Sequence, residues 1–436
     1  MAASGGDWGI IGISLQSPHM HDALAPQGFA YTAVEQNPDG FRYRQVEVIQ
    51  DVLVAREDPA RVLTAMADPN IKIVTLTVTE KGYCHEPSSG RLNLQHPDIQ
   101  HDLEATIPRS APGFLVRALM QRRAAGIAPF TVLTCDNLPQ NGALVRGLVL
   151  ELAQLIDPSL ADWIEQEGRF PSTMVDRIVP ATQSEDIDAV SAILGHYDAA
   201  PVMHEPFRQW VVEDHFVNDS RPDLGAVGVT LVDDVIPYEH MKLRCLNGTH
   251  SSLAYLGYLA GHETIADTVA DPVFAQYVKQ LWKNEILPVL TPPPGADLDA
   301  YTAELFQRYS NPAIRHRTWQ IAMDGSQKLP QRILGTLEEN FAAGRDARGL
   351  MLAVAGWMRY VSGIDEHGQP IDVRDPLAQK LRAISDAETG IDKARKLLGV
   401  SEVFPAQLAE QLAPGVTAAY AQLEKLGARA AVEALT

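Results

Sequence analysis

Cysteine is scarce in this sequence, which has three in 436 residues: Cys84, Cys135 and Cys245. They are widely spaced and odd in number, which fits neither a disulfide framework nor a paired CxxC zinc site. The sequence also has no HExxH segment and no Cys/His cluster with the spacing of metal ligands. We therefore expect a reducing compartment and a functional site without a metal.

Long apolar runs and positive charge are also lacking. No stretch approaches the roughly 20 apolar residues of a membrane span, and residues 1–7 lack the basic and apolar regions of a signal peptide. The chain has 36 lysines and arginines against 55 acidic residues, a formal charge of −19. Broad contact with nucleic-acid phosphates is excluded by that balance. We expect a cytoplasmic protein with neither a membrane nor a nucleic acid as partner.

The first half of the chain alternates two kinds of segment. Residues 8–14, 71–77 and 130–135 are β-rich, whereas residues 60–66 and 114–124 have helical periodicity. Such alternation predicts a parallel sheet covered by helices. The nearly continuous apolar and β-branched run of residues 71–77 is typical of a strand buried on both faces. The following loop, residues 80–83, should then lie where open α/β sheets bind ligands.

The second half has long Ala- and Leu-rich helical patterns, at residues 274–286, 329–343, 350–361 and 406–426. They predict an α-helical domain. The strand signal gives way to the helical one around residues 232–238, so we place a domain boundary near Asp233. Two domains also agree with the length, because 436 residues exceed what one hydrophobic core usually supports.

The most informative segment is Glu239-His-Met-Lys-Leu-Arg-Cys-Leu-Asn-Gly-Thr-His250. Four polar residues stand out in this segment: Glu239, Lys242, Asn247 and His250. With α-helical spacing, their side chains and that of Leu246 fall within an arc of roughly 140° around the helix axis. The oxidation of an alcohol needs a base for the hydroxyl proton, and a lysine whose pKa is lowered by burial can serve. Amide donors such as Asn247, and a second one at Asn137, could hold the oxygen that gains negative charge.

Each of these residues also has a plain structural interpretation. A lysine on a helix usually extends its tip into solvent, and a helical histidine such as His250 is more often a hydrogen-bonded structural residue. Asn247-Gly248 could be a helix irregularity, and Cys135-Asp-Asn-Leu-Pro could be a strand exit with an Asx turn. The combination of these residue types favours the catalytic interpretation.

The pattern Lys-x-x-x-x-Asn-Gly-x-His of residues 242–250, followed by Ser-Ser-Leu-Ala-Tyr-Leu-Gly-Tyr, resembles the signature of the long-chain mannitol dehydrogenase family. The resemblance continues through further blocks in the family's order, at residues 77–83, 130–139, 174–180, 205–211, 234–239 and 324–330. It covers nearly the whole chain. It implies a Rossmann-like α/β domain, residues 1–233, that binds NAD or NADP, and an all-α substrate domain, residues 234–436.

The resemblance also implies roles for individual residues. Lys242 would be the general base, Asn137 and Asn247 the oxyanion-binding pair, and Glu239 a carboxylate that relays the proton. The substrate hydroxyls would be contacted by His250, Asp176, Lys328 and Arg177. We further predict cofactor contacts from Gly12, Thr79, Glu80 and Lys81. The family uses no zinc and is often monomeric.

The sequence departs from the family pattern in three places. The family's first strand and glycine-rich loop are missing before residue 8, so the sheet should be incomplete at its N-terminus, with unpaired edges and apolar surface. Gly6-x-x-Gly9-x-x-Gly12 is no substitute, because it does not lie between a strand and a helix. Ser17-Pro18-His19 has no carboxylate for the adenosine ribose, and Gln320 stands where an arginine is expected near the substrate.

Three explanations for the missing loop compete: a coding sequence read from an internal methionine, a true deletion, or a branch that binds its cofactor differently. We favour the first. The leading functional hypothesis is a polyol dehydrogenase that forms a ketose from mannitol, arabinitol or sorbitol. A keto-uronate reductase is the close alternative, with Arg177, Arg244, Lys81 or Lys328 to hold the carboxylate. A third hypothesis is a catalytically inert sugar-binding protein.

Overall fold

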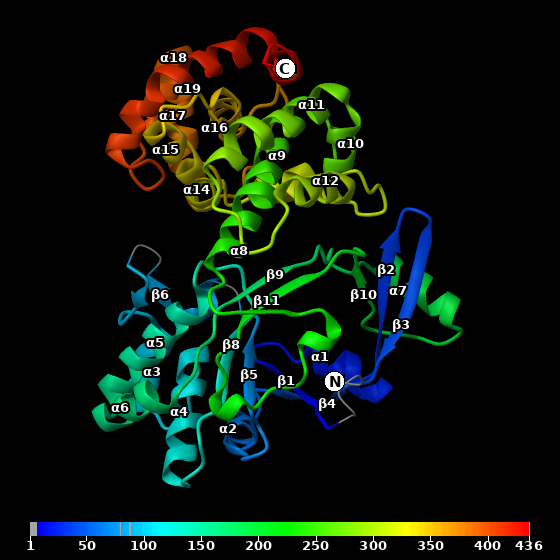
Figure 1. Ribbon diagram of the computed structural model, residues 1–436, viewed down its shortest axis with the longest axis vertical. Helices are drawn as coiled ribbons and strands as arrows, with labels where there is room; N and C mark the ends of the chain where they lie inside the picture. The colour runs from blue at the N-terminus through cyan, green and yellow to red at the C-terminus, as the bar shows by residue number, and fades with distance from the viewer. Residues whose placement is uncertain (1–6, 79, 87–88, 436) are drawn as a thin grey trace. The chain divides into compact units, whose positions relative to one another are not determined.

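The computed structural model describes residues 7–78, 80–86 and 89–435. The chain forms two compact units, residues 1–236 (unit 1) and 237–436 (unit 2). In Figure 1, unit 1 runs from blue to green, and unit 2 runs from green to red. The division falls three residues after the boundary predicted at Asp233.

Unit 1 is an α/β unit. Its strands are β1 Ile10–Ser14, β2 Tyr31–Asn37, β3 Gly40–Val46, β4 Ile49–Val54, β5 Ile73–Leu76, β6 His85–Glu86, β7 Arg91–Leu92, β8 Thr131–Thr134, β9 Thr173–Asp176, β10 Val202–His204, β11 Gln209–Glu213 and β12 Thr230–Val232. Its helices are α1 His19–Leu24, α2 Pro59–Ala67, α3 Pro97–Glu104, α4 Ala111–Ala124, α5 Asn141–Ile156, α6 Pro158–Glu167 and α7 Ser184–Leu194. Short 3-10 turns are η2 Ala25–Gln27, η3 Glu80–Tyr83, η4 Val217–Asp219 and η5 Gly225–Val227. The expected loop at residues 80–83 is thus a 3-10 turn.

Parallel pairing predominates, as predicted for the α/β domain. Four of the seven strand pairs described are parallel: β1 with β4, β2 with β10, β5 with β8 and β11 with β12. The β1–β4 and β5–β8 pairs form separate two-stranded sheets, and no ladder joins β1 to β5 among the described strands.

Strand β1 exposes apolar side chains, as expected for a sheet that is incomplete at this edge. Ile10, Ile11 and Ile13 are each 37–38% exposed. The prediction that residues 71–77 form a strand buried on both faces is wrong, because Thr75 in β5 is exposed and Ile73 and Val74 are only partly buried. A strand that is hydrogen-bonded on one side leaves its other edge accessible.

The core of unit 1 lies among α2, α4, α5, α6 and the strands β5 and β8. In Figure 1, helices α3 to α6 gather beside β8. Helix α4 begins where the Ser110 hydroxyl accepts the Gly113 N–H, a standard N-cap, and Pro112 stands in its first turn. Asp102, buried at the end of α3, accepts hydrogen bonds from the Ser110 N–H and hydroxyl, and so fixes this start.

Unit 2 consists of helices, as predicted. They are α8 Ile236–Met241, η6 Lys242–Gly248, α9 Thr249–Leu259, α10 Ile265–Ala270, α11 Pro272–Gln280, η7 Leu281–Ile286, η8 Leu287–Val289, α12 Leu298–Tyr309, α13 Thr318–Ala322, α14 Gly325–Leu329, η9 Pro330–Leu334, α15 Gly335–Ala342, α16 Arg348–Val361, α17 Ala378–Ala387, α18 Gly390–Leu398, α19 Ala406–Leu426 and α20 Ala428–Glu433. The segments η6, η7 and η9 are π-helical, and η8 is a 3-10 turn.

Two nearly fully buried helices, α9 and α16, form the centre of unit 2. They pack against each other, and α16 also packs against α19. Figure 1 shows both helices surrounded by the other helices of this unit. Because η6 continues directly into α9, the polar motif of residues 239–250 is attached to one of the two central helices of the unit.

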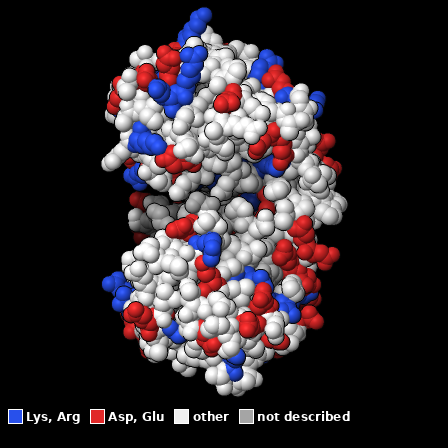
Figure 2. All heavy atoms as spheres, turned by 90° about the vertical axis from the view of Figure 1, so that its left-hand side faces the viewer, with Lys and Arg blue, Asp and Glu red and all other residues white. Residues whose placement is uncertain are grey.

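The surface agrees with the charge balance of the sequence. Figure 2 shows acidic and basic side chains interspersed on the visible face of each unit, without a broad basic area. No described helix is both long and apolar enough to cross a bilayer.

Candidate active site

The motif of residues 239–250 lies on one continuous helical segment at the start of unit 2. Glu239 is in α8, Lys242 and Asn247 are in η6, and His250 is in the first turn of α9. Lys242 and Asn247 are partly buried, whereas His250 is buried. The structure therefore places all four predicted side chains on one element.

The α-helical spacing assumed for this motif is wrong between residues 242 and 248, because the segment is a π-helix. Hydrogen bonds in a π-helix join residues five apart, so Lys242 and Asn247 lie one turn apart. With α-helical geometry they would be separated by about 140° around the axis. The wider turn thus brings the predicted base and the predicted amide donor closer together, and π segments are frequent at functional sites.

Side chains from neighbouring helices hold the π segment in place. The Trp282 indole Nε1–H donates to the Cys245 carbonyl at 3.0 Å, and the Tyr309 hydroxyl donates to the Leu246 carbonyl at 2.9 Å. Both carbonyls belong to η6, where the helical pairing is irregular. The π geometry is therefore built into the tertiary packing of unit 2.

Four aromatic rings form a column beside this segment. Trp282 stacks on Tyr309 with ring centres 6.1 Å apart, Tyr309 lies 4.8 Å from His250, and His250 meets His316 edge to face at 4.8 Å. The column fixes the orientation of the His250 ring, the predicted substrate contact, through packing on both sides.

Burial lowers the pKa of both histidines. The pKa of His316 falls to about 4, first through desolvation and then through the charges of Arg332 and Lys328. The pKa of His250 falls well below its ordinary value, again through desolvation first, and then through His316, Arg332 and Arg308. Both rings are therefore neutral at physiological pH and can each donate one hydrogen bond and accept one.

Acid should destabilise the protein partly through His316. Between pH 6.5 and about 4 the unfolded chain binds a proton at this residue that the folded chain does not, so the free energy of unfolding falls as the pH falls. When the pH is lowered from 7 to 4, the free energy of unfolding measured with urea should fall in wild type and in His316→Asn. The fall should be smaller in His316→Asn, by up to about 3 kcal/mol. The exposed His367→Asn serves as the control, and parallel pH curves for wild type and His316→Asn would contradict the prediction.

Gly248 in the Asn-Gly-x-His motif is explained by a close approach of two backbones. A Cβ atom at this position would lie 2.6 Å from the carbonyl oxygen of Arg332, in η9. Segment η6 packs directly on η9. Only glycine permits this contact, and through it the predicted catalytic helix is brought against the segment that carries Arg332.

Gly248→Ala should therefore lower the free energy of unfolding by about 1–3 kcal/mol, because backbone must move to admit the methyl group. Gly335→Ala is the matched control: its Cβ would meet no described atom within 4 Å, at the other end of η9. Alanine is the better helix former by about 1 kcal/mol, so this variant should be stabilised. Urea unfolding of both variants tests the contrast, and equal effects would count against it.

The cations proposed for the substrate have different surroundings. The Lys328 ammonium donates to the carbonyls of Met323 at 2.6 Å and Ile321 at 3.4 Å. Arg244 forms a two-pronged ion pair with Glu339, with N–O distances of 2.5 and 2.6 Å, which indicates a structural role.

Arg332 was not among the predicted residues. Its Nη1 lies 3.2 Å from the hydroxyl of Ser251, the residue that follows His250.

In unit 1, Asn137 is exposed in the turn after β8. The preceding carboxylate, Asp136, accepts the Leu138 N–H at 3.0 Å, which is the Asx turn considered for this segment. The Tyr83 hydroxyl donates to the other oxygen of Asp136. Buried Asn141 donates to the Thr173 carbonyl at 3.0 Å. These bonds tie the turn with Asn137 to the turn after β5 and to β9.

The two remaining substrate candidates of unit 1 lie at the end of β9. Asp176 is buried and is the last residue of that strand. Arg177 follows it and donates through Nε to the carbonyls of Glu205 and Phe207, both at 3.2 Å. Their predicted contact with substrate hydroxyls stays a prediction.

The predicted cofactor residues are only partly visible. Gly12 lies in the middle of β1, where a Cβ would be 3.2 Å from a methyl group of Val52, so it is a strand glycine. Glu80 and Lys81 belong to η3, and their side chains, like the whole of Thr79, lie outside the described residues.

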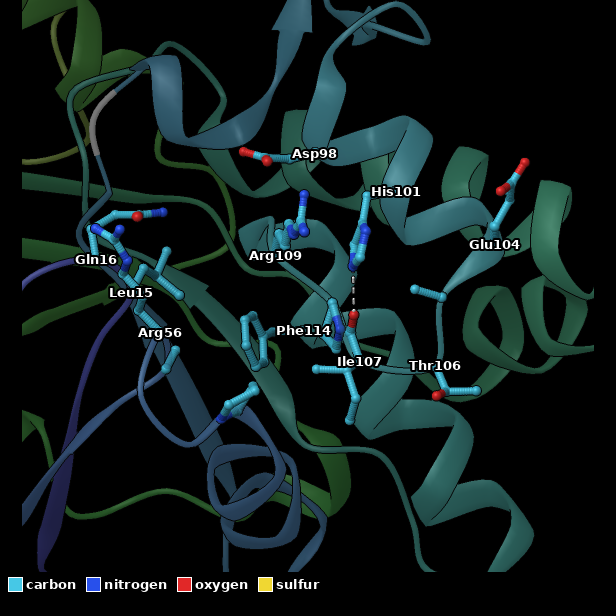
Figure 3. Close-up of a pocket in the computed structure, with 14 residues that line it drawn as sticks. Leu15, Gln16, Arg56, Asp98, His101, Glu104, Thr106, Ile107, Arg109 and Phe114 are labelled. Carbon is cyan, nitrogen blue, oxygen red and sulfur yellow. Dashed lines mark hydrogen bonds between the residues drawn. The ribbon is translucent and has the colours of Figure 1, made fainter.

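A cavity of about 990 Å³ lies at the carboxyl ends of β1 and β4 (Figure 3). Leu15 and Gln16 line it just after β1, Arg56 just after β4, Arg109 just before α4 and Phe114 from the first turn of α4. Open α/β sheets bind ligands at this position, and the volume is that of a large ligand site. The two arginines offer cations for phosphate groups, so the cavity fits a dinucleotide. The turns after β1 and β4 contain no glycine.

One cluster with metal-ligating atoms was missed by the sequence reasoning. Within the described part of the chain, the thiol of Cys84, the ring of His96 and the carboxylate of Asp98 bring ligand atoms within 4.8 Å of one another. Nδ1 of His96 accepts the Asp98 N–H at 3.2 Å and so caps α3. Burial raises the pKa of the Cys84 thiol to about 11, with further contributions from Asp98 and Asp102. A protonated thiol is a poor ligand, and helix capping accounts for the arrangement.

Known protein families and solved structures match nearly the whole chain. The mannitol dehydrogenase Rossmann domain matches residues 1–226, and the mannitol dehydrogenase C-terminal domain matches residues 234–424. The D-mannonate oxidoreductase of Escherichia coli (strain K12) is 48% identical, over 98% of this chain and 90% of the relative. A mannitol 2-dehydrogenase of Pyricularia oryzae is 40% identical, over 91% of this chain and 80% of the relative.

The solved structures agree with the sequence relatives. Pseudomonas fluorescens mannitol 2-dehydrogenase, in a ternary complex with NAD and D-mannitol, has a TM-score of 0.87 and 38% identity over 98% of this chain and 88% of that one. A substrate-free D-sorbitol dehydrogenase has a TM-score of 0.88 and 31% identity over 98% and 89% of the two chains. This chain therefore belongs to the mannitol dehydrogenase family, with a Rossmann domain followed by the family's helical C-terminal domain.

Proposed function

We propose that this chain is an NAD(P)-dependent oxidoreductase that interconverts a secondary alcohol of an open-chain polyol or sugar acid and the corresponding ketone. The observation that carries the proposal is the π segment η6, which sets Lys242 and Asn247 one turn apart, beside His250. The family relatives support it, because they are named for D-mannonate, mannitol and sorbitol, which share a six-carbon open chain.

Each residue of the site has one task in the oxidation. The Lys242 amine takes the hydroxyl proton, and Glu239, three residues earlier on the same helix, passes it on. A nicotinamide cofactor, when bound, would supply the acceptor for the hydride that leaves the carbinol carbon. Asn247 donates a hydrogen bond to the oxygen while it carries negative charge, and Asn137 in unit 1 is predicted to provide a second donor. The products are a ketone, a reduced cofactor and one proton.

We propose that His250 and Lys328 contact substrate hydroxyls, and Asp176 and Arg177 remain predicted substrate contacts. The neutral His250 suits this task, because it can both donate to and accept from hydroxyl groups. For the cofactor we infer the cavity at the carboxyl ends of β1 and β4, where Arg56 and Arg109 would hold its phosphates. We further propose that the protein is cytoplasmic and monomeric. Its activity needs no metal.

The test is turnover by the purified chain. Mannitol, sorbitol, arabinitol and D-mannonate are each supplied with NAD⁺ or NADP⁺, and formation of the reduced cofactor is followed by absorbance. We expect oxidation of at least one of them, unchanged after dialysis against a strong chelator. Loss of activity on chelation would refute independence of metals.

A second candidate, the inert sugar-binding protein, is favoured by one observation: no glycine lies in the turns after β1 and β4. It predicts sugar binding without turnover and without a change in NADH or NADPH fluorescence on titration. Turnover of any of the four substrates by this chain excludes it. Absence of turnover together with absence of nucleotide binding would refute the dehydrogenase proposal.

A further inference from the structure

Several cationic side chains act on the predicted substrate contact His250. The charges that shift the pKa of His250 and His316 come from cationic or histidine side chains: Arg308, Arg332, Lys328 and His316 itself. The α-helix α12 carries Arg308, which is buried, and Lys328 and Arg332 lie one helical turn apart on α14 and η9. The hydroxyls of a neutral polyol can only accept hydrogen bonds from these cations, whereas a substrate carboxylate would also gain from their charge.

Arg332 has the best position among these cations. Its Nη1 lies 3.2 Å from the Ser251 hydroxyl, next to His250 in the chain. The backbone contact between Gly248 and the Arg332 carbonyl fixes η9 against the predicted catalytic helix. His316, in contact with His250, offers a further polar atom: its Nδ1 is buried and has no hydrogen-bond partner in the described part of the chain.

At position 320, where the family pattern has an arginine near the substrate, this chain has Gln320, which is exposed on α13. Position 320 therefore provides no cation. Arg332 in η9 provides one beside Ser251, the residue that follows His250. Because a guanidinium presents a planar fork of N–H donors that matches a carboxylate, arginine is suited to this recognition.

We infer that Arg332 recognises a carboxylate on the substrate and makes this enzyme selective for a sugar acid over the matching polyol. The inference rests on the proposed function, since it assumes that the substrate lies against His250. Of the two substrate classes in the proposed function, an open-chain polyol and a sugar acid, it selects the sugar acid. The reaction is then the oxidation of an open-chain hexonate to a keto-uronate.

D-mannonate and D-mannitol form a matched pair for the test, because they differ in a terminal carboxylate against a terminal CH₂OH. Wild type should have the higher kcat/KM for D-mannonate. Arg332→Met should lower that value roughly 10- to 150-fold, the range for loss of hydrogen bonds to a charged group, and change the value for D-mannitol less than about 3-fold. Arg332→Lys should lie between, and Arg345→Met, at an exposed arginine of the same unit, should behave as wild type.

Equilibrium binding of the two sugars, measured by calorimetry, separates this inference from the proposed function. Binding of D-mannonate but not D-mannitol, lost in Arg332→Met, supports the inference even without turnover, in which case only the redox proposal fails. Equal binding of both sugars by wild type, or equal losses for both in Arg332→Met and Arg332→Lys, would overturn it.

Discussion

Replacing Lys242 with alanine should lower kcat for alcohol oxidation at least about 100-fold, because a positioned proton acceptor typically contributes that much or more. The side chain lies in the π segment η6, whose carbonyls are held by Trp282 and Tyr309 rather than by the lysine. The helix should therefore keep its shape in the variant. Steady-state kinetics with thermal unfolding and circular dichroism measure both parts of this expectation.

A matched control exists in the same unit. Lys283 is exposed and lies in another π segment, η7, so Lys283→Ala changes the same chemistry in a comparable backbone and should leave turnover unaffected. A primary amine added to the Lys242→Ala reaction should restore part of the rate, since it supplies the missing base. If Lys242→Ala keeps more than about a tenth of the wild-type rate, the general-base assignment is wrong.

Asn247→Ala should be nearly as damaging, with a loss of roughly 100- to 1,000-fold in kcat, the effect of removing one donor to a developing oxyanion. KM should change little, because this hydrogen bond strengthens as the oxygen gains charge in the transition state. Asn247→Asp is the sharper variant. It preserves the shape of the side chain, but an ionised carboxylate cannot donate and repels the alkoxide.

The control for this position is Asn284→Ala, at an exposed asparagine of η7. It should retain wild-type kcat and KM. A rise in KM with unchanged kcat in Asn247→Ala would contradict the prediction, because it would assign Asn247 to ground-state binding of the substrate.

Much of the fold could be read from hydrophobic periodicity. Helix α19 has the predicted bounds 406–426, and α2 and α4 contain the predicted segments 60–66 and 114–124. These elements have one period throughout. The two-unit organisation was predicted from the change in hydrophobic periodicity along the chain. Segments with a period near two residues occur in the first half, and the second half has a period near 3.6 residues.

Where the period changes within an element, the sequence reading was incomplete. The predicted helices at 274–286 and 329–343 each include a π segment, η7 or η9. A π segment depends on tertiary contacts, such as those of Trp282 and Tyr309 with η6, and these join residues far apart in the sequence. The angular positions in the Lys242 motif could therefore not be derived from spacing.

Arg332 was missed although a local signal existed. It lies four residues after Lys328 and two residues after the Asp324 to Pro330 block, so helical spacing puts it on the same side as that lysine. Its contact with Ser251 joins positions 81 residues apart, and the sequence gives no indication of that pairing.

The π geometry of η6 also bears on how genes of this family can diverge. A π segment amounts to one residue inserted into an α-helix, and deleting that residue would restore regular pairing. Regular pairing would return the Cys245 and Leu246 carbonyls to bonds within the helix, and they would lose the hydrogen bonds from Trp282 and Tyr309 that hold this segment in place. Helix length here is thus as constrained as residue identity. Alignments of functional homologues should be free of gaps from Glu239 to His250, with insertions and deletions confined to the surface turns.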